Sequence, residues 1–114
     1  MKPHDVPSAA DLVESVREWL QSDVLAATDG WLQYHARVAI NALSIVEREL
    51  ALGAEHDAKH RDRLRTLGVA DDVELAAAIR SGALDDRMDE VRLLVWQSVR
   101  DKLAVANPKY LASP

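Results

Sequence analysis

Hydrophobic residues along this chain recur with the spacing of α-helices. Over residues 8–25, apolar positions fall at i, i+4, i+7, i+8 and i+12, with charged residues opposite. These positions are Leu12, Val16, Trp19, Leu20 and Val24. Ser8 is a suitable N-cap after Pro7, and Asp11 falls in the first turn. The pattern predicts an amphipathic helix that packs on one side.

A second helix is predicted from Trp31 to Leu52, after a break at Asp29-Gly30 and before a C′ glycine at Gly53. Its apolar positions cover most of the circumference, which is typical of a central helix buried on most sides. The polar positions form one narrow stripe of Gln33, Arg37, Asn41, Ser44 and Arg48.

Three further helices are predicted over residues 54–67, 72–81 and 85–106. Gly68 ends the first, Asp71 or Asp72 caps the second before a stop at Gly82, and Pro108 ends the third. A short tail over 109–111 could fold back. No alternating run of strand length occurs. We expect one all-α domain over 1–114, a compact bundle of about five helices with the second and fifth central.

Composition and charge exclude several classes of function. The 114 residues suit a single domain, and the net charge of −5 argues against binding to nucleic acid or an anionic membrane. The absence of cysteine rules out disulfides, thiol nucleophiles and Cys-type zinc sites. No apolar run reaches the ~20 residues of a membrane span, and Met1 to Ala10 lacks the apolar stretch of a signal peptide. We expect a cytoplasmic protein.

Motifs for enzymatic chemistry are missing. The sequence has no G-x-G-x-x-G, no G-x-x-x-x-G-K-[ST], no G-x-S-x-G and no H-E-x-x-H. Its glycines all fall at predicted helix boundaries: Gly30, Gly53, Gly68 and Gly82. The sequence therefore predicts neither a catalytic site nor a cofactor.

The histidines are the remaining candidates for chemistry. His56 and His60, at i and i+4, could share a metal ion, but a third ligand would have to come from Asp57, His35 or a carboxylate elsewhere. Neighbouring basic residues would repel a cation, so we expect no metal. His35 falls within the apolar arc of the second helix, where a partly buried, neutral imidazole is expected.

The polar stripe of the second helix is either a solvent strip or a contact surface. In the second case, Arg37 and Asn41 would meet the tail at 107–110 or a partner protein. Four apolar residues lie beyond the reach of one neighbour or off the main apolar face: Leu32, Ile40, Leu43 and Leu93. Scattered on the surface they would be ordinary, whereas contiguous they would mark an interface. The interface candidates are Trp31, His35, Arg37, Asn41, Asn107, Lys109 and Tyr110.

Four stretches resemble a small bacterial domain family of unknown function. They are the run from Tyr34 to Leu43, the closing Asn107-Pro108-Lys109-Tyr110-Leu111, the pattern A-x-x-L-x-x-x-V-R-x-x-L from Ala9 to Leu20, and the run from Ala77 to Gly82. They occur in the right order and cover nearly the whole chain.

The resemblance implies an association. Members of the family are encoded beside aminoglycoside-phosphotransferase-like kinases and acyl-CoA dehydrogenases, a combination similar to the route that phosphorylates 4-hydroxyacyl-CoA esters such as those from levulinate. It implies a non-catalytic accessory subunit of the kinase, with no catalytic residues to carry over. Two alternatives stay open. One is a ligand-binding or catalytic bundle with His35 in an internal pocket and Arg37 or Lys109 holding an anionic acyl-CoA or phosphate. The other is a structural homodimer.

Overall fold

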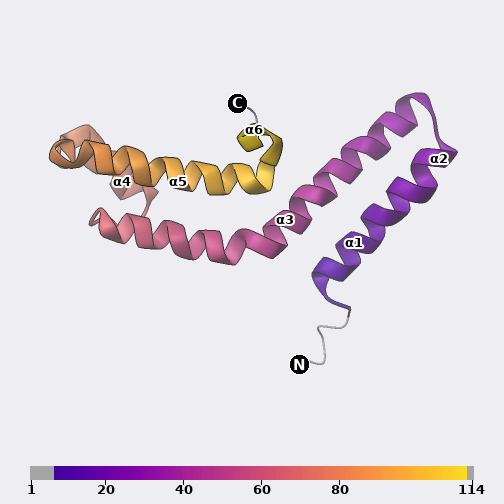
Figure 1. The fold of residues 1–114 in the computed structure, drawn as a ribbon, viewed down its shortest axis with the longest axis horizontal. Helices are drawn as coiled ribbons and strands as arrows, with labels where there is room; N and C mark the ends of the chain where they lie inside the picture. The colour runs from indigo at the N-terminus through magenta and orange to yellow at the C-terminus, as the bar shows by residue number, and fades with distance from the viewer. Residues whose placement is uncertain (1–6, 113–114) are drawn as a thin grey trace. The chain divides into compact units, whose positions relative to one another are not determined.

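The computed structural model describes residues 7–112, which form helices, turns and short connections and contain no strand. The all-α prediction is confirmed. The chain divides into two compact units, Met1–Ala51 and Leu52–Pro114. The longest helix, α3 (Gly30–Thr66), contributes its first part to one unit and the remainder to the other (Figure 1).

The first unit is a helical hairpin. Helix α1 (Ala9–Trp19) continues through a π-helical turn, η1 (Leu20–Val24), into the short α2 (Leu25–Ala27), and α3 then returns antiparallel to it (Figure 1). Ser8 caps α1 as predicted: the Asp11 N–H donates to Ser8 Oγ at 3.1 Å, and the Ser8 N–H donates to Asp11 Oδ2 at 3.2 Å. Gly30, at φ 51°, adopts the left-handed conformation in which the chain enters α3.

The two helices of the hairpin meet along one line of residues. On α1 these are the half-buried Val13, Arg17 and Leu20, and on α3 they are Ala36, Ile40, Leu43 and Glu47. Arg17 reaches across to form an ion pair with Glu47. At the closed end, Gln33 Nε2 donates to the carbonyl oxygens of Leu25 and Thr28 at 3.0 and 2.9 Å. Polar contacts thus fix the hairpin at both ends of a short apolar seam.

Two predictions for α3 are wrong. Gly53 does not end the helix, because it keeps a helical backbone between good helix formers, and a glycine inside a helix costs only about 1 kcal/mol relative to alanine. The predicted second and third helices are therefore one helix. The first part of α3 is also not buried on most sides, since α1 is its only neighbour within the hairpin.

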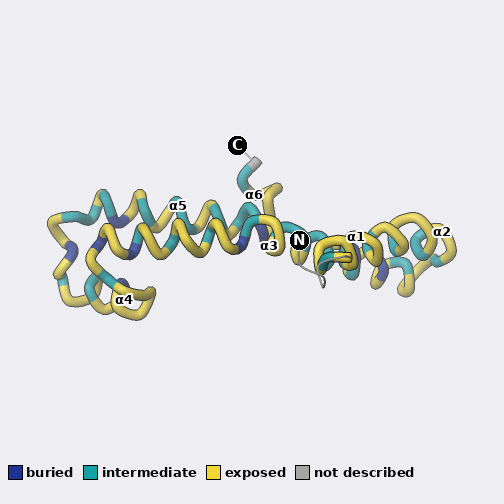
Figure 2. Tube along the Cα trace, turned by 90° about the horizontal axis from the view of Figure 1, so that it is seen from below, coloured by how far each residue is buried: buried dark blue, intermediate teal, exposed yellow. Residues whose placement is uncertain are grey.

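The second unit holds most of the buried apolar side chains (Figure 2). It consists of the end of α3, α4 (Asp72–Ser81), a 3₁₀ turn η2 (Asp85–Arg87), α5 (Met88–Ala106) and α6 (Pro108–Ala112). Its core cluster is Leu64, Leu67, Leu75, Leu84 and Val91. These residues come from α3 and the turn after it, α4, the turn before η2, and α5, so the core lies where these three helices converge.

The sequence predicted the ends of α4 correctly and the start of α5 incorrectly. The bounds of α4 are confirmed, with Asp71 accepting from the Glu74 N–H at 2.8 Å and Gly82 in the left-handed conformation at the end. The last long helix begins at Met88 and not at 85, because Asp85 and Asp86 lie within η2, and no side chain caps α5. Among residues 7–112, no helix combines the length and hydrophobicity needed to cross a membrane.

Candidate functional site

The hairpin of the first unit has one polar side. In two antiparallel helices, residues that directly follow the contact positions lie on the same side of the pair, because each step turns a helix by 100°. The residues that follow the contact positions in this hairpin are polar: Glu14, Glu18, Gln21, Arg37, Asn41, Ser44 and Arg48. The predicted polar stripe is therefore half of a polar surface that α1 completes.

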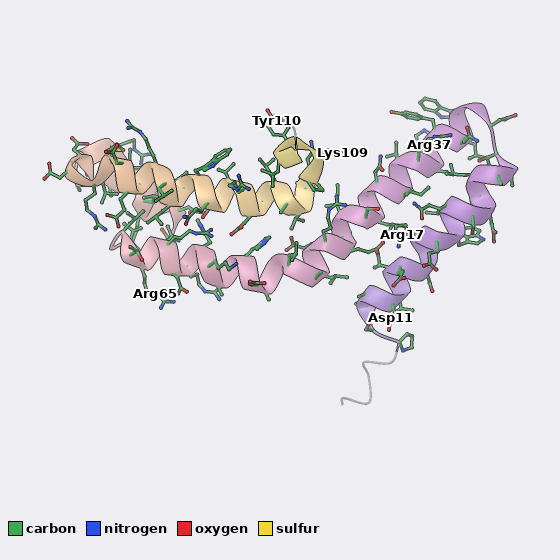
Figure 3. The ribbon with its side chains drawn as sticks, in the orientation of Figure 1. Asp11, Arg17, Arg37, Arg65, Lys109 and Tyr110 are labelled. Carbon is green, nitrogen blue, oxygen red and sulfur yellow. The ribbon has the colours of Figure 1, made fainter. Side chains whose placement is uncertain are left out.

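Charges on this polar side perturb one another. A hydrogen bond with Glu18, and the charge of that neighbour, raise the pKa of the Glu14 carboxyl. The hydrogen bond to Glu47 raises the pKa of Arg17, whose side chain extends from α1 toward α3 (Figure 3). Arg37 is exposed, and its Nη2 donates to Gln33 Oε1 at 3.4 Å.

The opposite side of the hairpin is apolar. By the same geometry, residues that directly precede the contact positions share this side, and Leu12, Val16 and Trp19 do so on α1. On α3 the same rule selects His35, Ala39, Ala42 and Val46, and Leu32 and Leu50 fall on the same stripe. We call the six large apolar residues on this side the apolar face: Leu12, Val16, Trp19, Leu32, Val46 and Leu50. Their exposed fractions range from 42% to 64%.

A second apolar surface runs along the outer side of α3, away from α1. We call it the aromatic stripe, and it consists of Trp31, Tyr34, Val38 and Ile45. Trp31 is 74% exposed and stacks on Tyr34, with ring centroids 5.7 Å apart. Two predicted interface residues, the exposed Arg37 and Asn41, flank this stripe. The structure thus brings Trp31, Arg37 and Asn41 onto one accessible surface.

His35 does not lie where the sequence placed it. We expected a partly buried imidazole, but the residue is exposed, because α1 covers a different side of α3. Its ring packs edge-on against Trp31 with centroids 4.4 Å apart. An exposed ring on a helix surface does not line an internal pocket, so the feature that motivated the pocket hypothesis is absent.

The remaining candidates lie on the second unit, at the end of α5 and in α6. The Asn107 N–H donates to the Leu103 carbonyl at 2.8 Å, and the Asn107 carbonyl accepts from the Tyr110 N–H at 3.0 Å. Lys109 and Tyr110 are both exposed on α6 (Figure 3). These residues cap one helix and begin the next, which gives Asn107 a local structural role.

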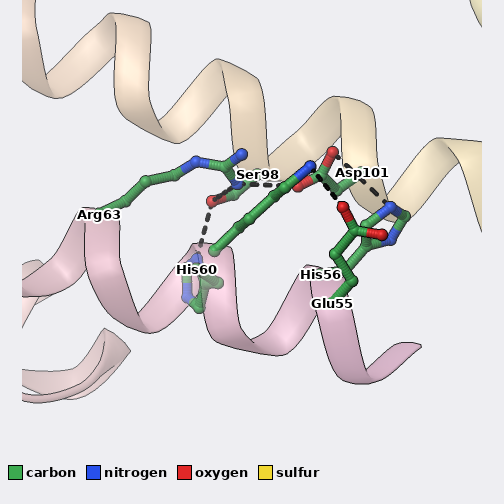
Figure 4. Close-up of polar contacts among 7 residues, drawn as sticks. Glu55, His56, His60, Arg63, Ser98 and Asp101 are labelled. Carbon is green, nitrogen blue, oxygen red and sulfur yellow. Dashed lines mark hydrogen bonds and ion pairs between the residues drawn. The ribbon is translucent and has the colours of Figure 1, made fainter. Parts of the chain in front are cut away.

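A polar groove in the second unit was not anticipated from the sequence. It has a volume of about 410 Å³ and lies between α3, α4 and α5. His60 Nδ1 lies 2.7 Å from Ser98 Oγ (Figure 4). Its Nε2 lies 2.8 Å from Asp72 Oδ1. Arg63 Nη1 donates to Ser98 Oγ at 3.0 Å and to Asp101 Oδ2 at 2.9 Å. The groove therefore centres on a hydroxyl contacted by two side chains of α3.

One assignment of protons satisfies the whole network. Arg63 donates to Ser98 Oγ, the Ser98 hydroxyl donates to His60 Nδ1, and the His60 Nε2–H donates to Asp72. The order Ser98, His60, Asp72 is that of a hydrolase triad. However, Ser98 lies inside α5, where the backbone N–H groups bond within the helix and cannot stabilise an oxyanion. The arrangement favours a role in holding three helices together.

The groove does not form a metal site. His56 Nε2 lies 3.9 Å from Asp101 Oδ1, while His60 contacts Asp72 instead. Within the described part of the chain, no group of three or more possible ligands converges on one point. The stripe that His56 and His60 share with the buried Leu64 and Leu67 was the one sequence signal for this groove, since it directs both imidazoles toward the core side of α3.

Comparison with known proteins gives one match. No curated protein and no solved structure matches this chain significantly. Residues 26–110 match the model of a family described as a domain of unknown function, DUF6285. The matched range includes the aromatic stripe, the second unit up to Tyr110, and all seven predicted interface residues. Because the match covers well over half of the sequence, the chain belongs to the DUF6285 family.

Proposed function

We propose that this chain is a non-catalytic interaction protein that docks onto a partner protein through the aromatic stripe of α3. The observation that carries the proposal is the exposure of Trp31, Tyr34, Val38 and Ile45 along one side of a helix. Large aromatic side chains that are exposed to water would be stabilised if a partner buried them. Exposed apolar patches of this kind mark interaction surfaces.

The surroundings of the stripe fit the composition of a protein interface. Interface centres are enriched in tryptophan, tyrosine and arginine, and a few such residues supply most of the binding energy. Trp31 and Tyr34 stack on each other, so their positions are partly fixed before a partner binds. Arg37 and Asn41 flank the apolar side chains with donors for carboxylates or backbone carbonyls of the partner.

The partner we propose is an aminoglycoside-phosphotransferase-like kinase acting in hydroxyacyl-CoA catabolism of the levulinate type. The resemblance of the stretches at 34–43 and 107–111 to a family encoded beside such kinases supports this choice. The missing nucleotide-binding motifs agree with it, since an accessory subunit leaves nucleotide binding to the kinase.

Co-expression of the tagged chain with an aminoglycoside-phosphotransferase-like kinase from the same organism tests the proposal. The wild-type chain should retain the kinase, and Trp31→Ala or Tyr34→Ala should weaken the complex at least about tenfold, as loss of an aromatic hot spot does. Val73→Ala is the matched control, because Val73 is an exposed apolar residue of α4 outside the stripe. A kinase that does not co-purify, or a complex that tolerates both aromatic substitutions, would refute the proposal.

A further inference from the structure

The apolar face of the hairpin consists of different residues from the aromatic stripe, and His35 lies between the two on α3. It spans both helices, whereas the stripe lies on the outer side of α3 alone. In the hairpin only Ala36 and Ile40 are buried, at 7% and 8% exposure, and both lie on the seam. Two helices have one seam between them, so a hairpin with a whole side of Leu, Val and Trp requires a further layer to cover it.

The size of the apolar face suits a specific interface. Six half-exposed side chains of this kind offer on the order of 600 Å² per chain. Two such faces pressed together would bury about 1,200 Å² in total, which lies at the lower end of the range for stable protein complexes. The face is therefore large enough to hold two molecules together.

The chemistry of the face favours a second copy of this chain over a different protein. None of its six residues is charged, and Glu14 and Glu18 lie on the other side of the hairpin, although the imidazole of His35 borders the face. The indole N–H of Trp19 is the one polar group of these side chains, which leaves little to specify a different partner. Two-fold pairing of identical patches is also the commonest form of oligomer.

We propose that two copies of this chain pair through their apolar faces, so that two hairpins form a four-helix bundle. Each hairpin supplies one layer, and Leu12, Val16, Trp19 and their counterparts on α3 fill the space between the layers. The polar sides of both hairpins then face water. The aromatic stripes stay accessible on the outer sides of α3, so pairing and docking of the proposed partner use different residues.

Light scattering coupled to size exclusion, on the full chain, tests the pairing. The wild-type chain should show twice its mass of 12.6 kDa. Val16→Glu should give a monomer with unchanged helical circular dichroism, because Val16 is already exposed in the single chain. Gln21→Glu adds the same charge on the polar side and should remain a dimer.

A gentler variant keeps the test informative if Val16→Glu fails to fold. Trp19→Ala adds no charge and should raise the dissociation constant of the dimer at least about tenfold. A monomeric wild-type chain, or a dimer that withstands both Val16→Glu and Trp19→Ala, would overturn the proposal. Trp31→Ala should leave the mass unchanged, so failure of this proposal and of kinase docking can be told apart.

Discussion

Replacing Ser98 with alanine tests whether the polar groove stabilises the second unit. The change removes the oxygen that accepts from Arg63 at 3.0 Å and contacts His60 at 2.7 Å. A hydrogen bond to a charged group contributes about 1.5–3 kcal/mol, and a neutral one about 0.5–1.5 kcal/mol. Both bonds are only partly buried, which favours the lower values. Alanine returns about 0.5 kcal/mol through its higher helix propensity.

We therefore expect Ser98→Ala to lower the free energy of unfolding by about 1–2 kcal/mol. Urea unfolding followed by circular dichroism would measure the change. In a thermal melt, each kcal/mol corresponds to a shift of about 4–8 °C for a domain of this size.

Ser44→Ala is the matched control. Ser44 is also half-buried in a helix, but its hydroxyl donates only to the Ile40 carbonyl of the same helix, at 3.0 Å. This substitution should change stability by less than about 0.5 kcal/mol. If Ser98→Ala is as harmless as Ser44→Ala, the groove network contributes nothing to stability and the structural role assigned to His60 and Arg63 is refuted.

Three further predictions concern local features of the second unit. Asp71→Ala removes the N-cap of α4 and should cost about 1 kcal/mol in urea unfolding; an unchanged midpoint would contradict the capping role. Gly82→Ala should cost about 1 kcal/mol or more in a thermal melt, because φ is 83° and the added Cβ would lie 3.1 Å from Asp85 Oδ2; equal or higher stability would contradict this strain. The hydrogen bond from Arg87 lowers the pKa of Glu90, so its stabilising effect is present above the unfolded-state pKa and is lost as pH falls through the lower folded value. Carboxyl NMR titration of Arg87→Gln should show this pKa rising toward 4.5, and an unmoved pKa would exclude Arg87 as the cause.

Helix ends were predictable where the signal lies within one turn of chain. Ser8 with Asp11, Asp71 with Glu74, and Gly82 all act on backbone groups three or four residues away, so reading the sequence locates them. The same reasoning predicted a wrong helix end at Gly53. A glycine ends a helix only where the residues that follow are more stable outside the helix than within it.

The candidate surfaces were less predictable because they depend on how helices pair. The sequence pattern places Leu12, Val16 and Trp19 on the buried side of the first helix. In the structure the contact line lies one residue further on, since Arg17 pairs with Glu47 thirty positions away. The groove depends on His60 meeting Ser98, which are 38 positions apart, and no local pattern links them.

The π-helical turn at Leu20–Val24 has a consequence for length variation in this chain. There the Leu25 N–H donates to the Leu20 carbonyl, so the turn holds one residue more than an α-helical turn. Deleting one residue from this turn would convert α1, η1 and α2 into one uninterrupted α-helix with all its backbone hydrogen bonds intact. The bond from the Leu25 N–H to the Leu20 carbonyl would then close an ordinary α-helical turn, so the residues before and after it would keep their directions. The Leu25 carbonyl would still accept from Gln33, so homologues lacking this residue should keep the same connection to the next helix.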